Sequence, residues 1–596
     1  MKIKLFLILI VSSTCFSTDR DVPADYATIQ LAIDAASSGD NIVISTGTYN
    51  ASAILPAAKN LVFKSPETGT KAVLTRASGG SQGFFRITSD CTGYTYEFQD
   101  LTFKENYAAH SNFSFAANCG ANLKLIRCKI DNDDVMSDSD VLYCAATIPA
   151  YARNLEFVDS EIEHSGFTGS NFMNLISFNK VSFLRTTINY VNANASGLMV
   201  LGGNTGDIYI NNNLFNVTDA AVFTGVTYDI RSFLFQKNIV RATFITKDSS
   251  ILAFGTQNIF TTPIIYDNVF DILGTSTQTW NGIKCLNTNC PAFSVLENTF
   301  TAPNQTKTIG SFFINIQGTG FASANFINNR IVGNAQYGIY LQTPIAIISG
   351  NYIDCCNPVR TNGGSGYQIS GNTLIANNYV GLDEGRCLVL SRQTLSGVSA
   401  KGPTINAWNV VGSSWDLSGV GATSRNMLCI LGASTNDSVV PIYYGLVTAA
   451  TDANDTVMVD RWIRCSDDSI VASIDATNYY ATVVKFANGS TIYNNFMDGH
   501  LAANTLTFDF NPRSGNNYID WNMYRAGTVS LSNLGYPRLA PAVQINLDTQ
   551  RIVWQTWPTT SEQTYHNDAH SIQNLDTSYH APTGWIPSLI PTINKK

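Results

Sequence analysis

The sequence predicts an all-β solenoid, in which short strands form coils that stack on one another. The first observation is a recurring motif, apolar-x-x-Asn-x-apolar, as in IYDNVF (Ile265 to Phe270) and VLENTF (Val295 to Phe300). The second is the near absence of helical periodicity after residue 36, where short apolar runs such as YGIYLQ alternate with turns. The third is the length, because 596 residues exceed the size at which one globular core keeps growing.

The motif repeats at intervals that are typical of a solenoid. Its asparagines are Asn213, Asn238, Asn268, Asn298, Asn329, Asn351 and Asn372, separated by 25, 30, 30, 31, 22 and 21 residues. The same frame recurs upstream at Leu101, Cys128, Ser160 and Thr186, and downstream at Asn495 and Asn522. Such a period predicts coils stacked about 4.8 Å apart. We interpret the asparagine as a structural turn residue, since it tolerates left-handed backbone angles and stacked amides can bond along a ladder.

Residues 1–17, MKIKLFLILIVSSTCFS, have the layout of a secretory signal peptide. Lys2 and Lys4 precede an apolar run from Leu5 to Val11, and small residues lead to Ser17, where we expect cleavage. The run is too short to span a bilayer, and no later stretch of the sequence is long and apolar enough to do so. We therefore expect the mature chain to be extracellular or at the cell surface, without a membrane span.

The segment VPADYATIQLAIDAASSGDNIVISTGTYN (residues 22–50) resembles the opening of right-handed parallel β-helix proteins of the pectin-lyase-like superfamily. The resemblance implies that a short amphipathic helix caps the first coil and that NIVISTGTY forms the first strand and turn. The apolar side of this helix would consist of Ile29, Leu31, Ile33 and Ala36. A cap matters because an unpaired sheet edge invites aggregation. With the asparagine repeats, the resemblance covers about residues 22–380 and 485–530 and implies a right-handed parallel β-helix.

The expected domain organisation places the parallel β-helix at residues 18–385 and its last coils, with a C-terminal cap, at 486–596. Residues 386–485 fit the coil frame poorly and predict an irregular β-rich insertion or degenerate coils. In the tail, VWQTWPTTSEQTYHNDAHSIQNLD is similar to a W-Q…D-x-H-S segment near the end of many secreted β-helix proteins. Its Asp, His and Ser are neighbours in sequence, which is not the geometry of a catalytic triad, so we interpret the segment as a structural cap.

Acidic residues gather where the resemblance places the active groove of pectin-lyase-like enzymes, on one parallel sheet beside the loop after the asparagine turn. The loop DNDDVMSDSD and its equivalent on the next coil, EIEHSGFTGS, form what we call the acidic coil pair (residues 131–140 and 161–170). Its candidate catalytic residues are Asp133, Asp134, Asp138, Asp140, Glu163 and His164. Clustered carboxylates can raise one another's pKa for acid–base hydrolysis. Asp131 and Asp133 could bind Ca2+, the one cofactor that the sequence suggests, beside a uronic acid.

The same residues also fit a solvated acidic loop, because the catalytic sets of the superfamily's enzymes are missing. The chain lacks the N-T-D, D-D, G-H-G and R-I-K set of polygalacturonases. It also lacks the W-x-D-H and R-x-P-x-x-R of pectate lyases and the L-G-R-P-W of pectin methylesterases. A second acidic loop, GLDEGRC, with Asp383, Glu384 and Arg386, lies several coils away. The sequence therefore leaves open whether the chain is an enzyme.

Cysteine usage predicts disulfides only in part. Removal of Cys15 with the signal peptide leaves eleven cysteines, so at least one thiol is free or pairs with another chain. Cys285 and Cys290, in CLNTNC, are close enough in sequence for a local bridge, and Cys355 and Cys356 are adjacent. The absence of C-x-x-C pairs and the small number of histidines, six, argue against a zinc site.

Eight N-x-S/T sequons are candidate glycosylation sites: Asn50, Asn112, Asn194, Asn216, Asn304, Asn436, Asn454 and Asn488. A chain this rich in asparagine, serine and threonine contains about this many by chance, so their number alone does not predict glycans. A secretory host that glycosylates proteins would nevertheless modify some of them.

Composition leaves two functional hypotheses. With 13% charged residues, a net charge of −8, and neither a phosphate-binding loop nor a basic stripe, the sequence argues against nucleic-acid and nucleotide partners. The first hypothesis is a secreted, non-catalytic β-helical protein that serves as a structural, coat or filament component, forms homo-oligomers, or binds polysaccharide through exposed aromatics and amides. The alternative is a polysaccharide lyase or glycoside hydrolase that acts on acidic polysaccharide at the acidic coil pair. Fold alone does not decide between them.

Overall fold

The computed structural model describes residues 17–383 apart from short loop segments, the longest of which is 133–141. Beyond residue 392 it describes the strands between Gln393 and Ser532 with a few adjoining residues. Several residues singled out above lie outside this described part: residues 1–16 of the expected signal peptide, Asp133, Asp134, Asp138, Asp140, Glu384, Arg386, the sequons Asn194, Asn304, Asn436, Asn454 and Asn488, and the tail after Ser532.

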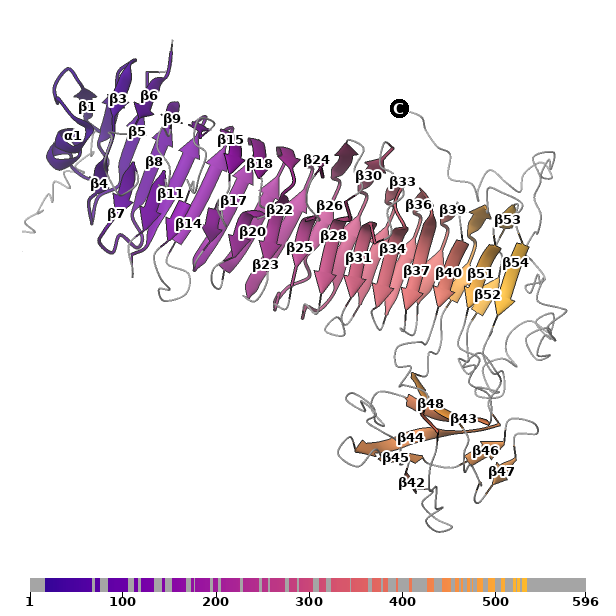
Figure 1. The fold of residues 1–596 in the computed structure, drawn as a ribbon. Coiled ribbons are helices and arrows are strands. Elements are labelled where there is room, and N and C mark those ends of the chain that lie inside the picture. Colours follow the sequence, from indigo (N-terminus) through magenta and orange to yellow (C-terminus); the bar gives the residue numbers. More distant parts are fainter. Residues whose placement is uncertain are drawn as a thin grey trace, which may run out of the picture. The chain divides into compact units, whose positions relative to one another are not determined.

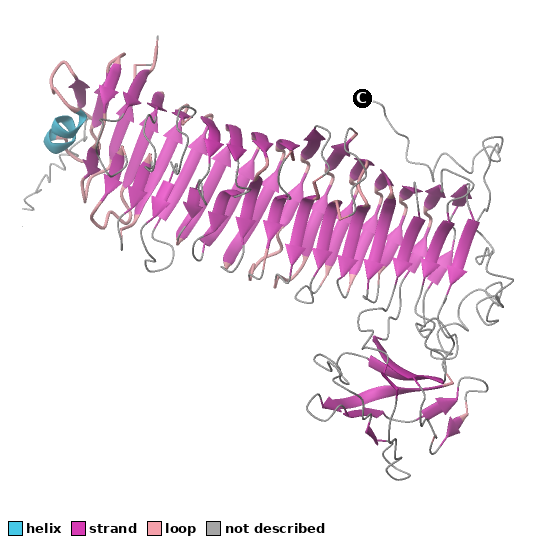
Figure 2. Ribbon diagram, in the orientation of Figure 1, coloured by secondary structure: helices cyan, strands magenta, loops and turns pink. Residues whose placement is uncertain are grey.

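The chain divides into two compact units, residues 1–222 with 228–231 and residues 223–227 with 232–596. The division falls within two strands, β22 (Ala221–Gly225) and β23 (Ile230–Gln236). Each unit contains three sheets of parallel strands, and consecutive strands along the chain belong to different sheets in rotation (Figure 1). This rotation is the architecture of a parallel β-helix, and Figure 2 shows how strongly strands dominate the fold. The prediction of an all-β, parallel β-helical fold is therefore confirmed.

In the first unit, three parallel sheets are built from short strands. The first sheet has the order β1 (Asp19–Val22), β2 (Asn41–Ile44), β5 (Leu61–Lys64), β8 (Thr95–Gln99), β11 (Ala121–Ile126), β14 (Arg153–Val158), β17 (Phe178–Leu184) and β20 (Thr205–Asn211). The second has β3 (Thr48–Asn50), β6 (Ala72–Thr75), β9 (Leu101–Lys104), β12 (Lys129–Asp131), β15 (Glu161–Phe167), β18 (Thr187–Asn192) and β21 (Leu214–Thr218). The third has β4 (Ala53–Leu55), β7 (Phe85–Ile87), β10 (Phe113–Phe115), β13 (Leu142–Cys144), β16 (Met173–Leu175) and β19 (Gly197–Leu201).

The second unit repeats this arrangement. Its first sheet has the order β26 (Ile264–Tyr266), β29 (Phe293–Leu296), β32 (Ala324–Ile327), β35 (Ala346–Ser349), β38 (Gln368–Ser370), β49 (Thr491–Tyr493) and β52 (Tyr518–Asp520). The second has β24 (Ile239–Thr243), β27 (Val269–Leu273), β30 (Thr299–Ala302), β33 (Arg330–Gly333), β36 (Tyr352–Cys355), β39 (Thr373–Ala376), β50 (Phe496–Asp498) and β53 (Met523–Arg525). The third has β25 (Ser249–Phe254), β28 (Trp280–Leu286), β31 (Phe312–Gln317), β34 (Tyr337–Gln342), β37 (Asn357–Asn362), β40 (Tyr379–Asp383), β51 (Thr505–Asp509) and β54 (Thr528–Ser532).

An antiparallel sheet interrupts this pattern in the chain. It contains β41 (Gln393–Thr394), β42 (Ala407–Asn409), β43 (Asn426–Gly432), β44 (Tyr443–Thr451), β45 (Thr456–Val459), β46 (Trp462–Arg464), β47 (Ile470–Val471) and β48 (Tyr480–Lys485). After it, β49 pairs in parallel with β38, and the β-helical frame resumes although more than a hundred residues separate the two strands.

The helix α1 (Ile29–Ala35) lies against β1, β2 and β4 (Figure 1). Thr28 is its N-cap, and its hydroxyl accepts a hydrogen bond from the Leu31 backbone N–H. The buried helical side chains are Ile29, Ala32 and Ile33, while Leu31 is 51% exposed. The expectation that Leu31 belongs to the apolar side was therefore wrong, because Ala32 occupies that position. The first strand is β1 rather than the NIVISTGTY segment, which supplies β2 and β3.

Apolar side chains inside each coil stack in register with those of the next. In the first unit, the paired interior positions of the first sheet are Phe63, Phe98, Leu125, Phe157, Phe183 and Ile210, and all are buried. The Phe157 and Phe183 rings stack with centroids 4.9 Å apart, and in the second unit Phe270 and Phe300 stack at 4.6 Å. These separations match the spacing between neighbouring strands, so each ring covers the next and the interior is closed to water.

The repeated asparagines of the second unit form a buried ladder. Asn298 illustrates the bonding: its Oδ1 accepts from the Asn268 backbone N–H at 3.0 Å, and its Nδ2 donates to the Ile265 carbonyl at 2.9 Å. The same pattern runs through Asn238, Asn268, Asn298, Asn329, Asn351, Asn372 and Asn495. The predicted amide ladder is confirmed, and it bonds backbone groups at the turn that would otherwise lack partners.

The left-handed backbone angle at each turn belongs to the residue before the ladder position, contrary to our expectation that the asparagine itself adopts it. These residues have φ between 49° and 68° and are Asp100, Arg127, Asp159, Arg185, Asn212, Lys237, Asp267, Glu297, Asn328, Gly350, Gly371 and Asn494. Asparagine is selected at the next position because its side chain carries both a donor and an acceptor.

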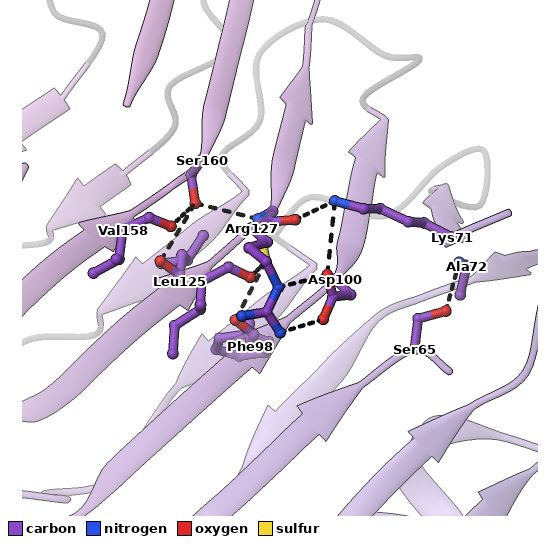
Figure 3. A network of polar contacts seen from close by, with 11 residues as sticks. Ser65, Lys71, Ala72, Phe98, Asp100, Leu125, Arg127, Val158 and Ser160 are labelled. Carbon is purple, nitrogen blue, oxygen red and sulfur yellow. Dashed lines mark hydrogen bonds and ion pairs between the residues drawn. The ribbon is translucent and has the colours of Figure 1, made fainter. Parts of the chain in front are cut away.

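Upstream coils keep this bonding with smaller side chains (Figure 3). The Ser160 hydroxyl accepts from the Cys128 backbone N–H at 3.2 Å, and its proton faces the carbonyls of Leu125 and Val158 at 3.3 and 2.9 Å. At the adjoining left-handed turn, Arg127 donates two hydrogen bonds to Asp100, at 3.0 and 2.6 Å. The turn thus combines a buried polar ladder with an exposed ion pair, and the ion pair contributes at most about 1 kcal/mol.

Candidate functional site

The structure brings part of the acidic coil pair together on the outward face of the second sheet of the first unit. Asp131 on β12 is in register with Glu163 on β15, and Lys129 with Glu161. Lys129 Nζ contacts Glu163 Oε2 and lies 3.9 Å from Glu161 Oε2. The carboxylates therefore belong to a mixed ion-pair cluster rather than to an isolated acidic patch.

The two glutamates of this cluster have opposite electrostatic environments. The hydrogen bond from Lys129 lowers the pKa of Glu163, whereas burial and the hydrogen bond with Glu163 raise the pKa of Glu161. A carboxyl group with a raised pKa beside a carboxylate with a lowered pKa is the arrangement that acid–base chemistry requires. The described part of the chain thus retains one feature of the enzyme hypothesis.

His164 does not join these glutamates. It follows Glu163 on β15, and because side chains alternate along a strand it points into the coil, where it is 1% exposed. Its Nδ1 lies 2.9 Å from the Asn132 carbonyl oxygen, and its ring stacks on Tyr190. Burial lowers its pKa to about 4. His164 is therefore a neutral interior residue, separated from the outward carboxylates by the strand itself.

Asp131, the described half of the expected calcium pair, lies 3.9 Å from Lys104 Nζ. Among the described residues, no group of three or more His, Cys, Asp or Glu side chains is arranged to hold a metal ion. The described geometry thus supplies an ion pair at Asp131, and Asp133 lies outside the described residues.

A second cluster, which we did not predict, lies on the outward face of the third sheet in the second unit. We call it the aromatic–amide face and define it by side chains of β28, β31, β34 and β37, which pair in this order (Figure 1). Its members are Asn281, Lys284, Phe312, Asn315, Gln317, Tyr337, Tyr340, Gln342 and Arg360. None of these side chains is a carboxylate, and two of them are cationic.

Three aromatic rings form the centre of this face. Phe312 and Tyr337 occupy the same position on neighbouring coils and stack with centroids 5.1 Å apart. Tyr340 lies 5.4 Å from Phe312 and 5.3 Å from Tyr337. Arg360 closes the cluster, since its Nη1 donates to the Tyr337 hydroxyl at 2.7 Å and its guanidinium lies over that ring. The half-buried Phe312, Tyr340 and Arg360 remain accessible to a ligand.

Amide side chains beside the rings hold one another in place. Gln317 Nε2 donates to Asn315 Oδ1 at 2.9 Å, and Asn315 Nδ2 donates to Asn281 Oδ1 at 3.1 Å. On the next coil, Gln342 Nε2 donates to the Tyr340 hydroxyl at 3.1 Å. Because these contacts fix the rotamers before any ligand arrives, less conformational entropy is lost when one binds.

The sequence contains a pattern that predicts this face, but the pattern departs from the regular alternation of inward and outward side chains in a strand. In YGIYLQ and FFINIQ the members of the face are at positions one, four and six, which pair between the two strands, although Tyr337 and Asn315 are themselves buried. We interpreted YGIYLQ only as an apolar run. Aligning the two segments at that spacing would have placed Phe312 above Tyr337 and Asn315 above Tyr340.

The predicted bridge between Cys285 and Cys290 is wrong, since Cys290 is a buried thiol. Burial raises its pKa to about 12, so the thiolate that would form a disulfide is scarce. Cys355 and Cys356 are also buried thiols. These buried cysteines thus pack as small apolar residues.

Three sequons lie in the described part. Asn50 is exposed at the end of β3, and Asn216 is half-buried and donates to Asn189 Oδ1 at 2.7 Å. Asn112 is 1% exposed and exchanges hydrogen bonds with Asn132, so the fold leaves no space for a glycan there.

The described part of the chain contains no helix that is long and apolar enough to cross a membrane.

Comparisons with known proteins assign the chain to no family. No protein-family model and no curated protein matches the chain. Among solved structures, it is similar to the A-module of the Azotobacter vinelandii mannuronan C-5 epimerase AlgE6. The identity is 14% and the TM-score 0.29, over 56% of this chain and 95% of that one. At this TM-score the similarity carries no argument about activity.

Proposed function

We propose that this protein is a non-catalytic, secreted β-helical protein that binds polysaccharide through the aromatic–amide face. The observation that carries the proposal is the grouping of two accessible rings, Phe312 and Tyr340, with amides and two cations on an outward sheet surface, where the buried Tyr337 supports the rings. Aromatic rings offer apolar surface to the C–H faces of sugars, and amide and guanidinium groups bind their hydroxyl or carboxylate oxygens. Such a mixture suits a ligand that is apolar on its faces and polar around its edge.

The proposal is tested with the F312A/Y340A variant and a panel of neutral and acidic polysaccharides in affinity electrophoresis. We expect at least roughly tenfold weaker binding of the retained polysaccharide, because central aromatic anchors carry much of the energy of an interface. Y352A is the matched control, since Tyr352 is another half-buried outward tyrosine with an arginine, Arg330, over its ring at 5.5 Å. Equal losses in both variants, or no retention of any glycan by the wild type, would refute the proposal.

The enzyme hypothesis is a second candidate because of the Glu161–Glu163 pair. To test the enzyme hypothesis, the protein is incubated with the same polysaccharide panel, with and without Ca2+. Reducing ends and unsaturated products are then measured. Product release that disappears in the E161Q/E163Q variant would place a polysaccharide lyase or glycoside hydrolase at the acidic coil pair. Binding without turnover supports the non-catalytic function.

A further inference from the structure

We infer that the ligand of the aromatic–amide face is an extended, β-linked polysaccharide lying across the strands, with one sugar ring per coil. This inference rests on the proposed function and specifies the ligand class and its direction. It follows from the way the outward side chains align from coil to coil.

The long dimension of the aromatic–amide face runs across the coils. The half-buried members are Asn281 and Phe312 in one column and Lys284, Tyr340 and Arg360 in the next. The buried side chains that complete the two columns and support these members are Tyr337, Asn357 and Asn315. Along β31, by contrast, a ligand would meet only Phe312 and Gln317. A chain molecule therefore finds more partners by crossing four strands than by following one.

The spacing of the columns selects the form of the chain. Neighbouring coils are about 4.8 Å apart, and the two accessible rings, Phe312 and Tyr340, lie on neighbouring coils with centroids 5.4 Å apart. This repeat is close to the advance per ring of an extended β-linked glycan, so consecutive sugars can stay in register with consecutive coils. An α-1,4-glucan winds into a helix and leaves such a row of sites after a few sugars. The spacing of the coils therefore favours an extended β-linked glycan over a helical α-1,4-glucan.

The residues at the ends of the columns also suit a glycan that places one sugar on each coil. Asn281 lies one coil before the rings and Arg360 one coil after Tyr340. Sugars over the rings would stack, whereas sugars over the ends would form hydrogen bonds. Affinity should therefore increase with chain length until the oligosaccharide covers the four strands.

Isothermal titration of the full chain with cellohexaose, chitohexaose, xylohexaose and maltohexaose tests this inference, and cellobiose tests the length dependence. We expect at least one β-linked hexasaccharide to bind roughly tenfold or more tightly than maltohexaose, a difference of about 1.4 kcal/mol, and cellobiose to bind more weakly than cellohexaose.

Equal or tighter binding of maltohexaose, or full affinity already at cellobiose, would overturn the inference. If that binding is still lost in F312A/Y340A, the proposed function survives, because the face binds glycan of another form. If no glycan of the wider panel binds, the proposed function itself fails.

Discussion

Replacing Asn298 with alanine is expected to lower the free energy of unfolding by about 3 to 5 kcal/mol, the largest effect of any single substitution considered for this chain. Asn298 is 1% exposed, and alanine would leave the Asn268 backbone N–H and the Ile265 carbonyl without their side-chain partner. Each buried group that loses its hydrogen bond costs about 1 to 3 kcal/mol. Urea unfolding followed by circular dichroism measures the total, and hydrogen exchange at the Asn268 amide measures the local effect.

Two further variants show whether the asparagine ladder is the cause of the stability lost in N298A. Asn325, an outward residue of β32, donates to Ser294 Oγ at 3.2 Å, and N325A should cost less than about 1 kcal/mol. N298S should recover part of the loss, because Ser160 fills the equivalent position of an upstream coil and bonds the same two kinds of backbone group. Equal destabilisation in N298A, N298S and N325A would rule out the ladder as the source of stability.

Acidification is expected to destabilise the fold through His164. Burial lowers its folded-state pKa from 6.5 to about 4, so between these pH values the unfolded chain binds a proton that the folded chain excludes. The stability that depends on neutral His164 is fully present above pH 6.5 and is lost as the pH falls towards 4. At 1.4 kcal/mol per pKa unit, the loss by pH 4.5 is about 2 to 3 kcal/mol.

The H164Q variant isolates this effect. Glutamine retains an amide that can reach the Asn132 carbonyl but does not titrate, so the carboxylates of the chain contribute equally to both proteins. The difference in free energy of unfolding between wild type and H164Q should shift by about 2 to 3 kcal/mol between pH 7.5 and 4.5. A pH-independent difference would show that His164 titrates normally in the folded chain.

Local sequence patterns predicted much of the fold. A parallel β-helix repeats one set of contacts, so the side chain that satisfies a turn in one coil recurs in the next, and the asparagine motif could be followed from Asn213 to Asn495. The left-handed residue before each asparagine escaped notice, because Asn, Asp, Lys, Glu and Gly all occupy this position. Leu31 was misassigned because the short helix α1 buries Ala32 instead, a choice made by packing against β1, β2 and β4.

The candidate site was less accessible to sequence reasoning for two physical reasons. Strand alternation separates Glu163 from His164 although they are adjacent in sequence, so a shared loop did not mean a shared face. The aromatic–amide face combines residues from four coils between Asn281 and Arg360, and only the register of β28, β31, β34 and β37 brings them together. Register depends on loop lengths, which vary from coil to coil.

Hydroxyl-radical footprinting of the protein with and without its bound polysaccharide shows directly whether the aromatic–amide face binds the glycan. We expect the glycan to reduce the oxidation of Phe312 and Tyr340 and to leave that of Tyr352 unchanged. Protection confined to the segment 153–167, which carries Glu161 and Glu163, would rule out binding at the aromatic–amide face and assign it to the acidic coil pair.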